Sequence, residues 1–389
     1  MDKDLYRTLC AMALGDVFGS EPRISRQLIQ TLGSPEAVFS LSDKEKSEIF
    51  GPYSKVAARL GEASIDKAWE RFGRLASEGV SIVGLTDSSY PPLLKECEDC
   101  PAVIYVRSST PPGELFKSGQ SVSVVGTRDL SLYGKEWGTR IVNAISRAPV
   151  KPTIVSGLAI GVDINAHFDA MTFGLPTIAV LPVGIDSVYP ARHRVAAEKI
   201  ASSPGGALIT DFPPGTAPTA YCFLRRNRII AGLSQSTILV ESKEKGGGML
   251  TARLAYGYQR NVFALPGRID DLRSAGCNRL IREKVAEPVD SLEMLPELLG
   301  LGSFDRRKCA GLEEEVREKY SGVLPEDELM ILLRIAELIR KTRGISLDGI
   351  CEAGAMSWQE ASRYAGMLEN DGFISIDLLQ RCVIKVKNC

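Results

Sequence analysis

Short apolar runs alternate with amphipathic stretches through the middle of the chain, from residue 121 to residue 265. Each run is four or five residues long, and a dozen or so residues with helical spacing of apolar positions separate most of them. Runs this short and continuous indicate strands buried on both faces, as in a parallel sheet covered by helices. We therefore predict an α/β fold with a doubly wound parallel sheet. Its strands are expected at 121–125, 153–156, 177–181, 207–210, 237–241 and 261–265.

The first 78 residues show a different pattern, that of short amphipathic helices. Leu5, Leu9 and Met12 are spaced for one helical face, and Gly33-Ser34-Pro35 is typical of the end of one helix and the start of the next. We predict an N-terminal helical module, similar to SAM or helix-hairpin-helix bundles. Such modules either contact a nucleic-acid backbone or bind proteins, and the second role is favoured. Strand-like runs at 80–85 and 102–106 then lead into the central sheet.

The C-terminal end again favours helices. Apolar residues at helical spacing predict three helices beginning near 329, 347 and 358, followed by strands at 373–376 and 382–386, which together indicate a winged helix. The third helix carries Glu360 and Glu369 but only Arg363, so protein contact is favoured over insertion into a DNA groove. Before this module, Arg306-Arg307-Lys308 and Glu313-Glu314-Glu315 mark a charged linker or helix. The predicted domains are 1–78, 79–300, the linker 301–325, and 326–389.

Charge and cysteine content narrow the function classes. Among 389 residues, 47 Lys and Arg balance 48 Asp and Glu, so binding of a polyanion requires a local patch. No apolar run approaches the roughly 18 residues of a membrane span, and the polar start does not resemble a signal peptide. Nine cysteines without regular spacing favour a reducing, cytoplasmic compartment. Only Cys97 and Cys100 form a C-x2-C pair, so we predict no metal site.

The best candidate patch is Phe223-Leu224-Arg225-Arg226-Asn227-Arg228. Its three arginines offer forked donors that suit phosphate, and Phe223 offers a face on which a base could stack. Glycine-rich turns follow three predicted strands, at 125–128, 156–161 and 245–248. Carboxyl ends of parallel strands meet at one edge, where helix N-termini favour anions, so we expect the four segments to lie together. Alternatively, the arginines form ion pairs and Phe223 is a core anchor.

Several spaced motifs in one order carry a family resemblance. They are VGTRDLSLYG at 125–134, SGLAIGVDINAH at 156–167, FLRRNRIIAGLS at 223–234 and GGGMLTARLA at 246–255. Over roughly residues 90 to 288, the chain resembles the DNA-processing protein A family (DprA, also called Smf). The resemblance implies an extended Rossmann domain that binds single-stranded DNA with little sequence preference and forms a homodimer. It also implies help in loading the RecA recombinase during natural transformation, without a catalytic activity or a cofactor.

The resemblance also implies which residues contact DNA, and the chemistry of each agrees. Four cations would neutralise phosphates, two glycines would let the backbone approach, and the aromatic ring would stack on a base. The asparagine is expected to hold its loop through side-chain to backbone bonds. The expected DNA-binding residues are Arg128, Ser156, Gly157, Phe223, Arg226, Asn227, Arg228, Lys245 and Gly247.

An alternative class is a small-nucleotide-binding protein or a nucleotide N-glycosidase. Against the glycosidase, the loop 245–251 lacks the proline and the catalytic carboxylate of that group. Against a dinucleotide dehydrogenase, no G-x-G-x-x-G follows the first strand. Asp163 and His167, one helical turn apart, could form an acid–base pair, but a structural role is favoured. His193 is expected to face solvent or a helix start.

Overall fold

The structure is a computed structural model that describes residues 2–116, 119–302, 312–342, 344–377 and 380–384. The chain divides into two compact units, Met1–Ser303 and Phe304–Cys389. No helix within these described ranges is both long enough and apolar enough to cross a membrane.

A nine-stranded sheet forms the centre of the first unit, with the order β1-β2-β6-β5-β4-β3-β7-β8-β9. All neighbours from β6 to β9 are parallel, whereas β1 and β2 are antiparallel to each other, and β2 is antiparallel to β6. The predicted α/β class and mostly parallel sheet are confirmed. The strands are β1 (Val80–Gly84), β2 (Val103–Arg107), β3 (Ser121–Val125), β4 (Thr153–Ser156), β5 (Thr177–Val180), β6 (Ala207–Thr210), β7 (Ser236–Leu239), β8 (Asn261–Ala264) and β9 (Glu287–Pro288).

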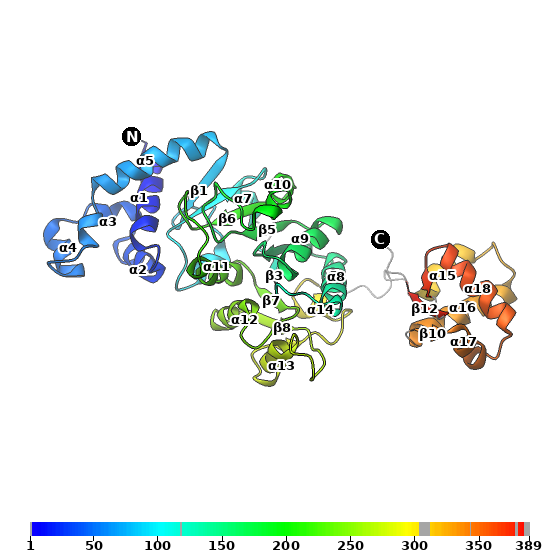
Figure 1. Ribbon diagram of the computed structural model, residues 1–389. Coiled ribbons are helices and arrows are strands. Elements are labelled where there is room, and N and C mark those ends of the chain that lie inside the picture. Colours follow the sequence, from blue (N-terminus) through cyan, green and yellow to red (C-terminus); the bar gives the residue numbers. More distant parts are fainter. Residues whose placement is uncertain (1, 117–118, 303–311, 343, 378–379, 385–389) are drawn as a thin grey trace. The chain divides into compact units, whose positions relative to one another are not determined.

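Helices cover both faces of this sheet, as its strands require. Alternate residues of β3 enter different cores: Val122 and Val124 pack with α8 and α9, whereas Val125 belongs to the core that includes α11 and α12. Figure 1 shows these two pairs of helices on opposite sides of the strands. The covering helices are α8 (Leu132–Ser146), α9 (Val162–Thr172), α10 (Arg194–Ser202), α11 (Ala220–Gly232), α12 (Gly247–Gly257), α13 (Ala275–Arg282) and α14 (Leu295–Leu298), with the 3-10 turn η2 (Ala191–His193) before α10.

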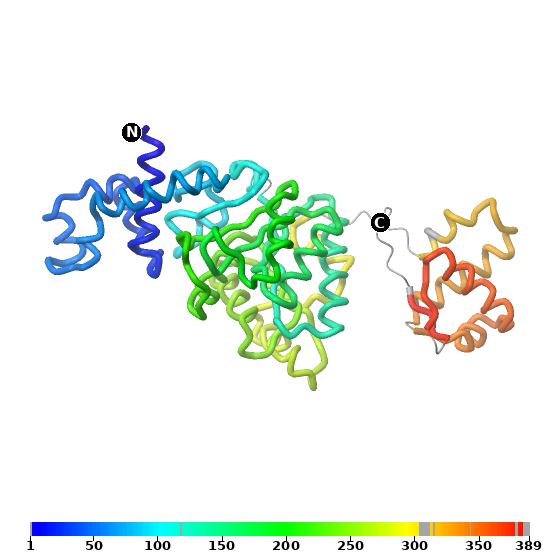
Figure 2. Tube along the Cα trace, turned by 45° about the horizontal axis from the view of Figure 1, so that its top comes forward, coloured from blue at the N-terminus to red at the C-terminus, as the bar shows by residue number. Residues whose placement is uncertain are grey.

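The N-terminal helices belong to the same unit as the sheet. Leu9 and Met12 of α1 are fully buried, and their core also contains Val80, Val103 and Leu75. Figure 2 shows these helices, in blue, beside the first strands, in cyan. An ion pair between Asp16 and Arg71 joins the first and last of them. They are α1 (Lys3–Phe18), α2 (Pro22–Leu32), α3 (Pro35–Phe39), α4 (Asp43–Phe50), η1 (Ala57–Arg59) and α5 (Glu62–Ser77); α6 (Pro92–Glu96) and α7 (Pro112–Leu115) follow near β2.

The second unit has its own core, in which Leu332, Ile335, Ile350 and Leu368 are fully buried. Its small sheet has the order β10-β12-β11, one strand more than the sequence analysis expected. The segment around Glu313 is helical, while Arg306-Arg307-Lys308 lies outside the described residues. The elements are α15 (Leu312–Tyr320), α16 (Glu326–Lys341), β10 (Ile345–Ser346), α17 (Leu347–Gly354), α18 (Trp358–Asn370), β11 (Ile374–Ile376) and β12 (Arg381–Ile384).

The glycine turns that follow β3, β4 and β7 touch one another through their backbones. Gly161 has φ 88°, and a Cβ atom there would lie 2.2 Å from the carbonyl oxygen of Thr127. A Cβ on Gly248 would lie 3.1 Å from the Cα of Gly126. Glycine at these positions therefore lets the three turns approach to backbone contact.

Replacing Gly161 by Ala should be costly because the new methyl group meets both an unfavourable φ and the Thr127 carbonyl. We expect a loss of roughly 3 kcal/mol in the free energy of unfolding, measured by denaturant titration. Gly174→Ala is the matched control, since its φ of 70° is also positive but no atom lies within 4 Å of the added Cβ. It should cost only about 1 kcal/mol. Equal losses would show that the turn contacts do not matter.

Candidate functional site

A cavity of about 370 Å³ opens at the carboxyl edge of the sheet, between the turns after β3, β4 and β7. Its volume lies at the lower end of the roughly 300–1,000 Å³ of small-ligand sites. The first turns of α11 and α12 complete the wall, so the arginine segment and the three glycine turns do share one edge, as predicted. Side chains that line the cavity include Arg128, Asp163, Phe223, Leu224, Arg226, Asn227, Ile230 and Thr251.

Helical periodicity divides the arginine segment between two faces of α11. Thr219 caps this helix by accepting a hydrogen bond from the Cys222 backbone N–H at 3.3 Å. Phe223, Arg226 and Ile230 then follow at intervals of three and four residues and line the cavity. Arg225 and Arg228 are on the other side of the same helix and line no part of it.

Arg226 is the buried cation of the cavity wall, with 3% of its surface exposed. Its Nη1 donates to the carbonyl oxygens of Gly157 and Val180, each at 2.5 Å. Burial lowers the pKa of Arg226 to about 10, against the attraction of Asp163, so the group still carries its charge at neutral pH. Within the described part of the chain, Nη2 has no hydrogen-bond partner. That nitrogen therefore remains able to donate to an anion.

Gly157 and Ser156 have roles different from those expected. A Cβ on Gly157 would lie 2.2 Å from Nη1 of Arg226, so this glycine makes room for the guanidinium and not for a ligand backbone. The Ser156 hydroxyl is fully buried and donates to the Val124 carbonyl oxygen at 2.7 Å. It joins β4 to β3, and its hydroxyl is already used. Both residues support the cavity from behind.

Arg128 and Lys245 are the exposed cations of the site. Neither forms an ion pair with any residue that the structure describes. The Arg128 Cζ lies 4.9 Å from the centre of the Phe223 ring, a cation–π distance. The rings of Tyr189 and Phe223 are in edge-to-face contact, with their centroids 5.3 Å apart and their planes at 71°. Phe223 is half-buried and not a core residue.

Asn227 and Gly247 connect α11 to the start of α12. Asn227 Nδ2 donates to the Gly247 carbonyl oxygen at 3.5 Å, the long end of the hydrogen-bond range, and its Oδ1 accepts from Nε of Arg226 at 3.2 Å. This agrees with the expected role of Asn227 in holding the loop. No atom lies within 4 Å of a Cβ built on Gly247, so the first residue of α12 is open to a ligand.

The expected phosphate role of Arg228 is inconsistent with the structure. Arg228 is 5% exposed, and it donates through Nη2 to Asp211 and through Nη1 to the Asp99 carbonyl oxygen. Arg225 reaches the same Asp211 carboxylate at 2.6 Å, so the ion-pair alternative holds for these two arginines. Sequence reasoning missed Asp211, although its position directly after β6, at the carboxyl edge, was a usable signal.

Asp163 and His167 are both buried and do not form an acid–base pair with each other. His167 Nδ1 lies 2.7 Å from the Thr177 hydroxyl, which itself donates to the Ile154 carbonyl oxygen, so we assign the proton to Nδ1. Burial lowers the pKa of His167 to about 3 and raises that of Asp163. A neutral His167 ties α9 to β5, which agrees with the structural interpretation.

His193 lies at the start of a helix, α10. It is the residue before α10 and is 9% exposed, and its Nδ1 lies 2.8 Å from the Leu158 carbonyl oxygen. Of the two environments expected for His193, solvent and a helix start, the structure shows the second. His193 instead fastens the 189–194 segment to the turn after β4.

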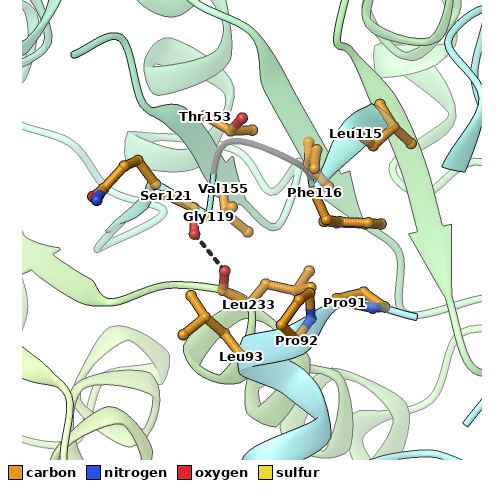
Figure 3. Close-up of a pocket in the computed structure, with 12 residues that line it drawn as sticks. Pro91, Pro92, Leu93, Leu115, Phe116, Gly119, Ser121, Thr153, Val155 and Leu233 are labelled. Carbon is orange, nitrogen blue, oxygen red and sulfur yellow. Dashed lines mark hydrogen bonds between the residues drawn. The ribbon is translucent and has the colours of Figure 1, made fainter. Parts of the chain in front are cut away.

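A small apolar cavity elsewhere in the described residues fits an anion less well. Figure 3 shows an apolar cavity of about 40 Å³ at the amino ends of β3 and β4, where Pro91, Pro92 and Phe116 face Val155. It has no charged side chain and space for about one water molecule. No group of three or more His, Cys, Asp or Glu that could hold a metal occurs in the described residues.

Comparisons with known proteins place the chain in a family. The family described as DNA recombination-mediator protein A matches residues 81–300. Protein Smf of Escherichia coli is 40% identical over 210 residues, which is 53% of this chain and 54% of that protein. The alignment thus spans about half the length of that relative.

Two solved structures are similar across most of their own length. DNA processing protein A of Streptococcus pneumoniae is 30% identical, with a TM-score of 0.54 over 67% of this chain and 92% of that one. The Helicobacter pylori protein, whose structure concerns its mode of binding single-stranded DNA, is 29% identical, with a TM-score of 0.50 over 57% and 96%.

Fold and cavity together define a class, the doubly wound α/β proteins with a cavity lined by cationic side chains at the switch point of the sheet. The switch lies at β3, which has β4 on one side and β7 on the other. Since the family match covers more than half of its length, the chain belongs to the DNA recombination-mediator protein A family.

The shared carboxylate of Asp211 should be essential for stability. Asp211→Asn leaves the buried Arg228 and the half-buried Arg225 without their counter-charge, so we expect a loss of about 3–5 kcal/mol in the free energy of unfolding. Asp270→Asn, which breaks the exposed pair with Arg268, should leave the urea midpoint almost unchanged. Similar midpoints for both variants would contradict this assignment.

Neutral His167 should make stability depend on pH in a defined direction. Its folded pKa lies below its unfolded value, so its contribution is complete above about pH 6.5 and is lost as the pH falls toward 3. Between pH 7.5 and 5, wild type should lose about 2 kcal/mol relative to His167→Gln. Parallel urea titrations at both pH values measure this, and an unchanged difference would show that His167 is not held neutral.

Proposed function

We propose that this protein binds single-stranded DNA in the cavity at the carboxyl edge of its sheet. The observation that carries the proposal is one cavity lined by Arg128, Arg226, Phe223 and the open start of α12, with the exposed Lys245 next to the lining residue Gly246. Cations with a stacking face are the usual composition of sites for unpaired nucleic acid. The single-stranded DNA binding of the related Helicobacter pylori protein supports the same conclusion.

Each group has a chemical task in this proposal. Arg128 and Lys245 contact phosphates from the exposed rim, and Arg226 donates from within the wall. The N–H groups at the start of α12 add the positive end of a helix dipole. Phe223 stacks on a base, which is possible only for a base outside a duplex. None of these contacts reads base edges, so little sequence preference is expected.

The biological role follows from family membership and the proposed ligand. We infer that the protein protects incoming strands in natural transformation and helps load RecA recombinase, without a catalytic step. We also infer that it acts in the cytoplasm and forms a homodimer through the domain at residues 79–300. The small-nucleotide alternative is kept as an outcome of the test below.

The remaining parts are assigned by their architecture. We infer that residues 1–78 form a SAM or helix-hairpin-helix-like module, and that residues 326–389 form a winged helix. Helix α15, inside the predicted linker 301–325, packs into the core of that second unit. In α18, Arg363 lies 3.2 Å from Glu328, and Glu360 is used in the helix cap. This helix therefore presents little free positive charge, which supports contact with a protein rather than with DNA.

Removing the two exposed cations should abolish most DNA binding. We expect Arg128→Ala combined with Lys245→Ala to weaken binding of a fluorescent thymidine homopolymer by tenfold or more, about 1.4 kcal/mol. In wild type, log affinity should fall with log salt at a slope of about −2, the value for three phosphate contacts. Fluorescence anisotropy at several salt concentrations, with duplex as competitor, measures both quantities.

Two outcomes would contradict the proposal. A flat salt response would exclude phosphate neutralisation as the source of affinity. Equal binding by wild type and the double variant would remove the cavity as the DNA site and favour a small nucleotide as its ligand.

A further inference from the structure

An aromatic and cationic surface adjoins the cavity at the segment 189–194. Tyr189 is 40% exposed and meets the cavity residue Phe223 edge-on, so its ring extends the aromatic surface beyond the cavity lining. Arg192 and Arg194 follow within five residues and are exposed. Neither contributes to an ion pair or a side-chain hydrogen bond with any residue in the described ranges. Free cations beside an exposed ring are the groups that a nucleic-acid strand requires.

The segment is held in place relative to the cavity. His193 lies between the two arginines in sequence, and its ring is bonded to the Leu158 carbonyl oxygen at 2.8 Å. Leu158 directly follows Gly157, whose carbonyl oxygen receives Arg226 at 2.5 Å. Through this short path, the turn that supports the buried cation also fixes the backbone of Arg192 and Arg194. The backbone of this segment is therefore held to the same turn that forms part of the cavity wall.

Two carboxylates near this segment in sequence, Asp186 and Glu198, are not ion-paired with Arg192 or Arg194. Asp186 is bonded to the backbone N–H of Gly215 at 2.9 Å. Glu198, one helical turn after Arg194, is exposed but forms no ion pair with it. The segment thus presents two unpaired cations and one exposed aromatic ring, with part of the positive charge offset by these carboxylates.

We propose that Tyr189, Arg192 and Arg194 form a second nucleotide subsite, over which a single strand continues after leaving the cavity. Tyr189 stacks on the base that follows the one at Phe223, and the two arginines contact the phosphates of that part of the strand. This inference rests on the proposed function and extends it, because it sets a direction for the strand, from α12 across α11 toward α10.

Strand length separates the two sites in an experiment. A thymidine trinucleotide is short enough to be held by the cavity, whereas a decamer can also reach the second subsite. For Arg192→Ala with Arg194→Ala, we expect decamer affinity to fall at least about fivefold and the salt slope to become less steep by about 1.4. Trinucleotide affinity should stay within about twofold of wild type, since the cavity is intact.

The matched control is Lys67→Ala with Arg74→Ala. These two residues are exposed on α5, line no part of the cavity and change the net charge by the same amount. Decamer affinity should be unchanged in this variant. A loss equal to that of the arginine variant would mean that total charge, not the subsite, sets the affinity, and would overturn the proposal.

Two substitutions of Tyr189 test whether its aromatic ring contributes to binding. Tyr189→Phe keeps the stacking face and should bind the decamer like wild type, whereas Tyr189→Leu should weaken it about fivefold. Normal decamer binding by Tyr189→Leu would contradict the stacking role.

The outcomes also separate this inference from the function it rests on. Wild type that binds neither oligonucleotide defeats both. If Arg128→Ala with Lys245→Ala weakens both lengths while Arg192→Ala with Arg194→Ala weakens neither, the cavity is the DNA site and the second subsite is wrong.

Discussion

The contact of the Arg226 guanidinium with the carbonyl oxygens of Gly157 and Val180 is the interaction on which the site depends. A buried cation is costly unless its donors are used, and here the strand ends supply the acceptors. The contact fixes α11 in register against β4 and β5. Because Phe223 and Asn227 are on the same face of this helix, their positions at the cavity follow from that register.

The opposite face of α11 carries a second buried arrangement with the same effect. Arg225 and Arg228 meet one carboxylate, Asp211, at the end of β6. Removing the Asp211 carboxylate, or the arginines that pair with it, would leave an uncompensated charge in a low-dielectric environment. A helix bearing three arginines can therefore be held firmly on both sides, while only one guanidinium remains partly available to a ligand.

Backbone makes up much of the remaining cavity wall. The turns after β3, β4 and β7 contain glycines that approach one another closely, and the start of α12 lies among them. N–H groups and a helix dipole recognise charge, not base identity. Exposed cations at Arg128 and Lys245, and the aromatic step from Phe223 to Tyr189, add contacts that suit a flexible strand. These features are the basis on which we propose a repeating anionic ligand bound without a sequence code.

The sequence by itself determined the α/β class, the six parallel strands and the edge at which the cavity lies, because buried strands and glycine turns leave local signals. It also located Arg128, Phe223, Arg226, Asn227, Lys245 and Gly247 at that edge. Only the tertiary structure decided which arginines face the cavity. Asp211 is distant from Arg225 and Arg228 in sequence, and its pairing depends on strand order and helix rotation. For the same reason, the sequence did not show that Gly157 contacts Arg226. The two residues lie far apart in the chain, at the end of β4 and in α11.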